Sequence, residues 1–339
     1  MKKVMRRTRR LCDGMKGQNY WFNGCMEFLM ERLGEDTRDY NYWFFSNVTG
    51  DSLMQLYSKN IHKTAWHPST NLFDAAFAKK AFDACGYEFE YIAGLDDANR
   101  GTYLPKIKQY IDRGIPIITR VGQFEFGLLC GYRKNKLYFL RCDQKKPRVM
   151  ENDFSELIFV GEKKPRLTLA QVYMQTVMDI PSYILRPSTD EYSFGRQAFI
   201  DWAESFRNGT YDGIPPEEIE PWNVHGTYLC MAGTNGCAES CMRHALELNP
   251  GMTFVNQLLP LYERHQEVFH QLAYCDAEGK NDYENGGLCG GFKITPETIK
   301  DKARMRPISE KIMEAVTICD EILAVFEGIN LDMSEGEPA

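Results

Sequence analysis

Consecutive short apolar runs between residues 115 and 160 restrict the fold of this chain more than any other feature. They are Ile115–Val121, Phe126–Tyr132, Lys136–Arg141 and Leu157–Val160. Turn residues separate them, and the stretch Arg133–Lys136 is typical of a hairpin connection. Strands that follow one another without intervening helices pair antiparallel. The segment therefore predicts an α+β fold rather than a doubly wound parallel sheet.

Helical periodicity lies on both sides of these runs. Between Asn23, a candidate cap, and the stop residue Gly34, apolar side chains recur at helical spacing and predict a helix over Gly24–Leu33. Short strands are expected at Tyr42–Phe45 and Tyr87–Ile92. The other predicted helices are Leu72–Cys85, Tyr103–Arg113, Leu167–Met178, Tyr192–Arg207, Gly236–Leu248, Thr253–Cys275 and Pro296–Phe326. The second half of the chain is therefore expected to be mainly α-helical.

The length of 339 residues suits one large domain or two ordinary ones. The change of pattern along the chain predicts an α+β domain over residues 1–165 and a helical domain over residues 166–331. The last residues, 332–339, are acidic or small and predict a disordered tail.

The charge of the chain is unevenly distributed. There are 40 basic and 47 acidic side chains, but the first ten residues carry six positive charges and no acid, so the remainder has 34 basic and 47 acidic residues, or −13. We interpret the basic start as a solvated or frayed terminus. An acidic body lacks the basic face that nucleic-acid binding requires, so we predict no nucleic-acid partner.

Apolar segments and cysteines define the expected compartment. No apolar run approaches the roughly 18 residues that a membrane span needs, and no apolar segment follows the basic start as it would in a signal peptide. We therefore predict a cytoplasmic protein without membrane contact, whose eleven cysteines stay reduced. The sequence has no Walker, GxGxxG, HExxH or GxSxG motif, and we predict no cofactor.

Cys237, Cys241 and His244 form a candidate zinc set, because the spacing i, i+4, i+7 places them on one face of a helix. The set lacks the paired CxxC knuckles of most structural zinc sites, and cysteine is an ordinary core residue of helices. We therefore predict no metal site.

Cys25 has the position most suggestive of chemistry. It lies in the first turn of a predicted helix, where unpaired backbone N–H groups and the helix dipole favour a thiolate. The preceding residues Trp21, Phe22 and Asn23 give the helix an aromatic-rich start, as at the nucleophile of papain-like enzymes. A buried structural thiol explains the position equally well.

Three longer stretches extend this pattern. They are Arg113–Val121 (RGIPIITRV), Glu125–Tyr132 (EFGLLCGY) and Leu137–Asp143 (LYFLRCD). Together with Cys25 they resemble the papain-like cysteine peptidase superfamily, in its bacteriocin leader-peptidase-like branch. In particular, the chain is similar to the group related to butirosin biosynthesis protein H, an acyltransferase acting on an aminoglycoside. The segment Tyr192–Phe206 and the helical second half resemble uncharacterised bacterial members of that group. The resemblance implies a papain-like fold for the N-terminal half.

The resemblance also implies roles for single residues. Cys25 matches the nucleophile and Asp143 the orienting acid, while Asn19 or Gln18 lies near the place of the oxyanion-hole side chain. The histidine position, six residues before a glycine, holds Glu125. A carboxylate does not exchange protons as imidazole does near neutral pH, and its negative charge raises the pKa of a neighbouring thiol.

The six histidines of the chain lie outside the matched motif. Among them, His225 in the loop-like stretch Asn223–Gly226 is the best placed substitute for the missing base. The others are His62, His67, His244, His265 and His270, which we interpret as surface or core residues.

Two functions follow from these residues. The first is a protein with lost or altered thiol chemistry that binds a small molecule or peptide in the ancestral cleft, lined by Trp21, Tyr42 and Trp43. The alternative is an active cysteine acyltransferase or amide hydrolase that uses Cys25 as its nucleophile. A homodimer formed through the helical half is compatible with both.

Overall fold

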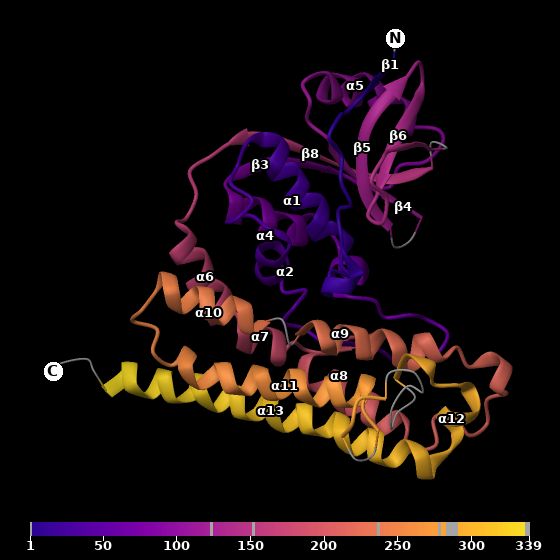
Figure 1. Cartoon of the computed structure of the whole chain (residues 1–339), viewed down its shortest axis with the longest axis vertical. Helices are drawn as coiled ribbons and strands as arrows, with labels where there is room; N and C mark the ends of the chain where they lie inside the picture. The colour runs from indigo at the N-terminus through magenta and orange to yellow at the C-terminus, as the bar shows by residue number, and fades with distance from the viewer. Residues whose placement is uncertain are drawn as a thin grey trace. The chain divides into compact units, whose positions relative to one another are not determined.

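The computed structural model describes residues 2–122, 125–150, 153–235, 238–276, 279–282 and 291–335. The chain divides into two compact units. Unit 1 consists of Met1–Thr49 and Leu72–Val172, and unit 2 of Gly50–Asn71 and Tyr173–Ala339. Both are drawn in Figure 1. The junction after Val172 lies seven residues beyond the boundary predicted at residue 165. Residues 50–71 belong to unit 2, whereas the sequence predicted two contiguous domains.

Unit 1 is built on an antiparallel sheet (Figure 1). Within the described residues its order is β3-β8-β4-β5-β6-β7, and β1 pairs with β5. The strands are β1 (Lys2–Val4), β3 (Tyr87–Ile92), β4 (Ile117–Val121), β5 (Glu125–Arg133), β6 (Lys136–Arg141), β7 (Arg148–Val149) and β8 (Phe154–Lys163). The predicted antiparallel strands are therefore confirmed. The predicted hairpin is also present, because Arg133 pairs with Lys136 across a two-residue loop.

The helices of unit 1 match the sequence pattern with two corrections. They are α1 (Trp21–Leu33), α2 (Tyr42–Val48), α4 (Ala75–Cys85) and α5 (Leu104–Asp112), with short 3-10 turns η1 (Gly14–Lys16) and η2 (Arg100–Tyr103). The capping role predicted for Asn23 is wrong, because α1 begins at Trp21 and Asn23 is buried inside it. The strand predicted at Tyr42–Phe45 is also wrong. Asn41 accepts a hydrogen bond from the Phe44 N–H and starts helix α2 instead, so the cap outweighs the β propensity of the aromatic residues.

An aromatic cluster joins the helices of unit 1 to the sheet. The Phe22 ring of α1 packs edge-to-face against Phe126 of β5 and Phe77 of α4, with centroids 5.7 and 5.9 Å apart. Phe73 lies against both, 4.6 Å from Phe126 and 5.4 Å from Phe77. Such contacts stabilise the core beyond the burial of their apolar area. The cluster fixes the start of α1, and with it Cys25, beside β5.

Lys2–Val4 of the basic N-terminal segment belong to the sheet, so the interpretation of this segment as frayed is wrong. Lys2, Arg6, Arg7 and Arg10 are exposed, as expected of a solvated terminus. Val4 lies opposite Gly131 of β5 in the β1 register, and the Met5 N–H donates to the Cys130 carbonyl at 2.8 Å. A Cβ atom on Gly131 would lie 2.7 Å from the Lys3 carbonyl oxygen and 2.8 Å from the Val4 Cα. Only glycine at this position lets β1 approach so closely.

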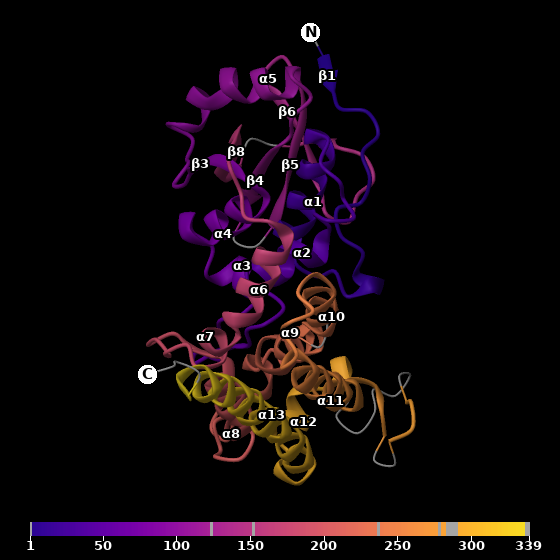
Figure 2. The same cartoon turned by 90° about the vertical axis from the view of Figure 1, so that its left-hand side faces the viewer.

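Unit 2 is mainly α-helical, as predicted. Its longer helices are α8 (Gly195–Ser205), α9 (Thr227–Asn235), α10 (Ala238–Leu248), α11 (Val255–Tyr274) and α13 (Lys302–Glu335). Helices α11 and α13 lie side by side in both views (Figures 1 and 2). Two short strands, β2 (Leu56–Ser58) and β9 (Tyr192–Phe194), lie far apart in the sequence and pair antiparallel. The smaller helical elements are α3 (Pro68–Asn71), α7 (Ile180–Ile184), α12 (Pro296–Lys300), the 3-10 turns η3 (Pro216–Glu218) and η5 (Gly291–Lys293), and the π-helix η4 (Trp222–Gly226). Helix α6 (Leu169–Met178) contains the point of division between the units.

Several boundaries in unit 2 differ from the prediction. The helix expected over Tyr192–Arg207 begins only at Gly195, after strand β9. Asp301 has an extended backbone and separates α12 from α13 within the stretch predicted as one helix. Helix α13 continues to Glu335, so the prediction of a disordered tail over residues 332–339 is wrong for residues 332–335. Residues 336–339 lie outside the described residues. No helix in the described part of the chain combines the length and the apolar character that a membrane crossing requires.

Three histidines, His67, His225 and His265, are buried in unit 2. His225 of η4 is fully buried between the rings of Trp202 and Phe206, and neither of its ring nitrogens has a hydrogen-bond partner among the described residues. Burial lowers the pKa of His225 to about 3 and that of His265 to about 4. Both imidazoles are therefore neutral in the folded protein at neutral pH.

We expect Gly131→Ala to destabilise the docking of β1. The added methyl group collides with the Lys3 carbonyl and the Val4 backbone, so the strand must shift. The expected loss of unfolding free energy is about 1–3 kcal/mol in urea unfolding, with faster hydrogen exchange at the Met5 amide. Gly101→Ala is the matched control, because a Cβ there meets nothing within 4 Å. Equal stability of both variants would contradict the tight docking of β1.

We expect the stability of the protein to fall as the pH falls below 6.5. The unfolded chain protonates His225 near its ordinary pKa of 6.5, whereas the folded protein keeps it neutral down to about 3. The unfolded state thus binds more protons than the folded state. For this residue, the free energy of unfolding falls by about 2 kcal/mol between pH 6.5 and pH 5. Urea midpoints of His225→Leu should fall less over this range than those of the wild type. His62→Leu, at an exposed position, should keep the wild-type slope, and equal slopes for all three proteins would contradict the prediction.

Candidate functional site

Cys25 lies beneath the N-terminal segment of the chain. Gly24, its neighbour in α1, has no room for a side chain, because a Cβ would lie 2.1 Å from the Leu11 carbonyl oxygen. The N–H groups of Leu11 and Cys12 both donate to the Cys142 carbonyl, at 3.0 and 3.4 Å. The segment is thereby held against the start of α1. Cys25 has an exposed fraction of 0%.

Cys25, Cys142 and Cys12 form a cluster of buried thiols. Cys142 hydrogen-bonds to the thiols of both Cys25 and Cys12, and its Sγ donates to the Phe126 carbonyl at 3.4 Å. Burial raises the pKa of Cys25, and the nearby Cys12 and Glu125 raise it further, while the hydrogen bond with Cys142 acts in the opposite direction. Burial likewise raises the pKa of Cys142. Cys25 and Cys142 are therefore protonated thiols at neutral pH, the opposite of an activated nucleophile.

Glu125 and Asp143 are joined by an arginine that the sequence reasoning did not single out. The Arg141 Nε lies 2.8 Å from the Glu125 Oε1 and 3.4 Å from the Asp143 Oδ1. Burial raises the pKa of Glu125 and nearby Asp143 adds to this, whereas Arg141 lowers it. The Asp143 side chain is 72% exposed. The structure thus places Glu125 within electrostatic range of Cys25, but Arg141 rather than an imidazole lies between the two carboxylates.

No histidine of the chain belongs to unit 1. All six lie in residues 50–71 or 173–339, which form unit 2. The substitute base predicted from the sequence, His225, is not in a loop but in the π-helix η4, enclosed by aromatic rings. A fully buried imidazole with a lowered pKa is a core residue, so His225, the candidate substitute for the missing base, is not placed to act as one.

The residues predicted to line a cleft separate into two groups. Tyr42 is buried, and its hydroxyl accepts a hydrogen bond from the Tyr20 N–H at 2.8 Å, so it is a core residue rather than a lining residue. Trp21, Trp43 and Asn19 are half-buried. The Tyr42 ring contacts Trp43 edge-to-face at 5.0 Å and thus links it to the segment before α1. We call Trp21, Trp43 and Asn19 the aromatic patch. Gln18, the other oxyanion-hole candidate, accepts a hydrogen bond from the Asp13 N–H.

The metal candidates do not form a common site within the described residues. Cys237 lies outside them. Cys241 is buried in the core of unit 2, whereas His244 is half-buried and its Nδ1 lies 3.0 Å from the Glu247 Oε2. Nowhere in the described part of the chain do three or more histidine, cysteine or acidic side chains gather so that they could hold a metal ion.

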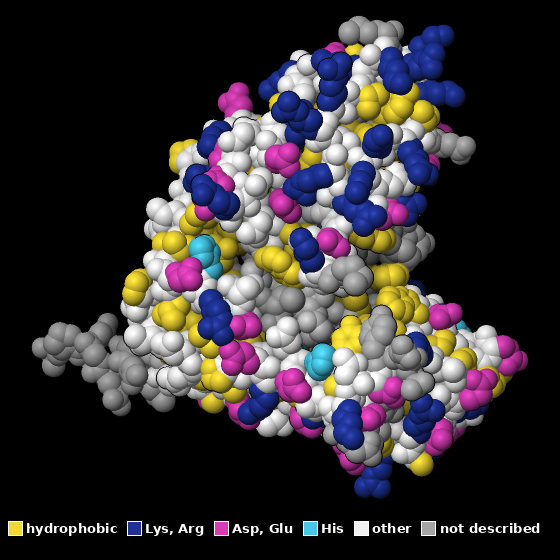
Figure 3. Space-filling view, in the orientation of Figure 1, with side chains coloured by type: hydrophobic (Ala, Val, Ile, Leu, Met, Phe, Trp, Pro, Cys, Tyr) yellow, Lys and Arg dark blue, Asp and Glu magenta, His cyan; other side chains and the backbone are white. Residues whose placement is uncertain are grey.

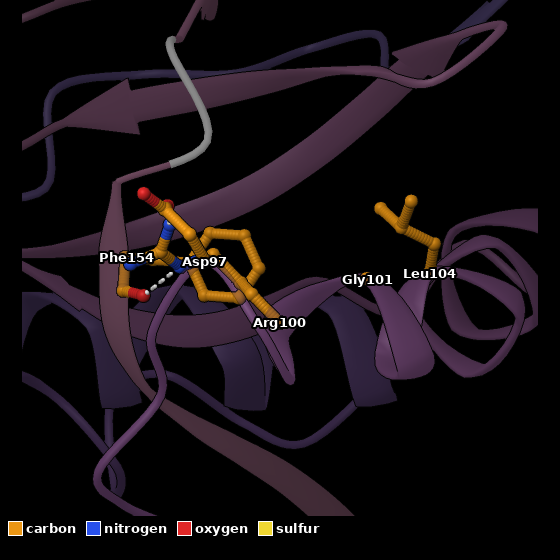
Figure 4. Close-up of a pocket in the computed structure, with 5 residues that line it drawn as sticks. All are labelled: Asp97, Arg100, Gly101, Leu104 and Phe154. Carbon is orange, nitrogen blue, oxygen red and sulfur yellow. Dashed lines mark hydrogen bonds and ion pairs between the residues drawn. The ribbon is translucent and has the colours of Figure 1, made fainter.

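Two hollows in unit 1 were not predicted from the sequence. The first, of about 240 Å³, lies beside Arg100, Asp97, Phe154 and Leu104 (Figure 4). Arg100 is fixed there, because it donates to the Phe154 carbonyl and to Asp97, each at 2.6 Å. The second, of about 390 Å³, is formed by β1, the end of α1 and the end of α5. The basic residues at the N-terminus are the sequence feature that points to this second hollow. Interpreting them as a frayed end did not predict that they line it.

A scan of the chain against models of known protein families found no match. A search among curated proteins likewise found no similar sequence.

We expect native Cys25 to be unreactive toward iodoacetamide at neutral pH. Burial is the largest cause of its raised pKa, so the thiol lacks both access and thiolate character. Mass spectrometry of the Cys25 peptide should show labelling only after unfolding. Glu125→Gln removes the negative charge but keeps the burial, and Cys25 should stay unlabelled in this variant. Rapid native labelling that Cys25→Ser abolishes would contradict the prediction.

Proposed function

We propose that unit 1 is a papain-like domain that has lost thiol chemistry and binds a small molecule or peptide. The observation that carries the proposal is the state of Cys25, a fully buried thiol with a raised pKa. Thiol catalysis needs a thiolate and a base that returns the proton. Unit 1 contains no histidine, and Glu125 opposes the formation of a thiolate by its charge.

The replacement of the base by a salt-bridged carboxylate supports the same proposal. Glu125 contacts Arg141, and this contact lowers the pKa of the carboxyl group that burial would otherwise raise further. A carboxylate held by an arginine is a poor proton acceptor for a thiol of raised pKa. The arrangement is suited to fixed polar recognition, because Arg141 is half exposed and offers further guanidinium N–H groups.

The aromatic patch is the proposed binding surface. Trp21 begins α1, and its carbonyl accepts a weak hydrogen bond from the Cys142 thiol at 3.7 Å, so the start of α1 lies next to Cys142. Half-buried indole rings supply apolar contact area, and Arg141 and Asn19 supply hydrogen-bonding groups. This combination fits a peptide or a small molecule that carries amide or carboxylate groups.

The alternative remains an active acyltransferase or amide hydrolase. The hydrogen bond between the Cys25 and Cys142 thiols favours it, since this bond lowers the pKa of Cys25. Burial opposes this effect and is larger. Activity would therefore require the segment around Leu11 and Cys12 to leave the start of α1.

We expect peptides to bind at the aromatic patch without being cleaved. The probe is a mixture of random-sequence hexapeptides, added to the full chain with ¹⁵N-labelled indole groups. The signals of Trp21 and Trp43 should shift, whereas that of Trp202, which is fully buried in unit 2, should not. Mass spectrometry should find the peptides intact.

The matched variants separate the outcomes. Trp21→Ala with Trp43→Ala should abolish the binding, and Trp222→Ala, at a partly exposed tryptophan of unit 2, should preserve it. Absence of any shift in the wild type would refute the proposed binding. Cleavage or acyl transfer that disappears in Cys25→Ser would establish the alternative.

A further inference from the structure

The two units of the chain carry opposite charges. Unit 1 contains 26 Lys and Arg residues against 19 Asp and Glu, or +7, and unit 2 contains 14 against 28, or −14. The net charge of −7 for the whole chain conceals this difference. The acidic excess therefore lies in unit 2, and unit 1 has a basic surface that attracts anions.

Basic side chains of unit 1 gather where β1 and α5 lie (Figure 3). The hollow of about 390 Å³ at this place is lined by Lys2, Lys3 and Arg6 of the N-terminal segment and by Arg32 from the last turn of α1. The pairing of β1 with β5 brings these residues together, since Arg32 lies far from the other three in sequence.

Most of these cations have no carboxylate partner. Lys3 lies 3.4 Å from the Asp112 Oδ1 and donates to the Asp112 carbonyl at 2.6 Å. Arg32 donates to the Gly114 carbonyl. The Lys2 ammonium lies over the Tyr138 ring of β6, 5.4 Å from its centroid. Within the described residues, neither Arg32 nor Lys2 nor Arg6 forms an ion pair with a carboxylate. Like charges collected in a hollow repel one another, and a bound anion relieves this repulsion.

We propose that this hollow binds a small organic phosphate through Lys2, Arg6 and Arg32. A phosphate or diphosphate group supplies several negative charges and matches the guanidinium groups in geometry. Met5 and Ile111 also line the hollow and give its wall an apolar part that suits the organic remainder of the ligand. The site lies at the opposite end of α1 from Cys25, so it does not depend on the function proposed for the aromatic patch.

Calorimetric titration of the full chain with inorganic pyrophosphate tests the proposal. We expect saturable binding at one site per chain that weakens as sodium chloride is raised. Lys2→Gln with Arg6→Gln should weaken the binding at least about tenfold, because each cation contributes a charge-assisted contact. Both side chains are exposed, so the variant keeps the fold.

The matched control is Lys79→Gln with Lys80→Gln, two exposed lysines of α4 whose loss changes the net charge equally. It should bind pyrophosphate as the wild type does. Equal weakening in both double variants would overturn the proposal, since it would indicate a general charge effect. No binding of pyrophosphate would also overturn it. A single-stranded oligonucleotide that binds while pyrophosphate neither binds nor displaces it would assign the surface to nucleic acid instead.

Discussion

The close docking of the N-terminal segment is the interaction on which the features of unit 1 depend. It needs two glycines, because a side chain at Gly131 would collide with β1 and one at Gly24 would collide with the Leu11 carbonyl. Backbone hydrogen bonds to Cys130 and Cys142 then hold the segment along β5 and β6. The same docking buries Cys25 at one end of α1 and brings basic residues to Arg32 at the other.

Burial rather than charge is the main cause of the raised pKa values of Cys25 and Cys142. It is the largest cause of the raised pKa of Cys25, and the charge of Glu125 is a smaller one. Replacing the glutamate by a histidine would therefore not by itself activate Cys25, because the thiol would stay enclosed. The loss of thiol chemistry that we propose rests on the packing of the N-terminal segment as well as on the missing base.

The sequence predicted regular elements well where local pattern decides them. Strand β3 was expected at the residues where it lies, and α4 ends at Gly86 in the left-handed conformation that a stop residue adopts. Errors arose where a cap or a distant contact outweighed local propensity. The aromatic run after Asn41 became helix α2, and the basic terminus became strand β1 because Gly131 leaves space for it. For the candidate site, Cys25, Glu125 and Asp143 stay predictions from the resemblance, and the contact of Arg141 with both carboxylates was not predictable from the sequence.

By itself, the sequence determined the antiparallel strands and the helical second half. These are properties of neighbouring residues and their periodicity. The tertiary structure alone decided that Cys25 and His225 are buried, that Arg141 joins two carboxylates, and that four basic residues meet at one hollow. Burial and charge pairing depend on segments far apart in the chain, and no local pattern encodes which of them come into contact.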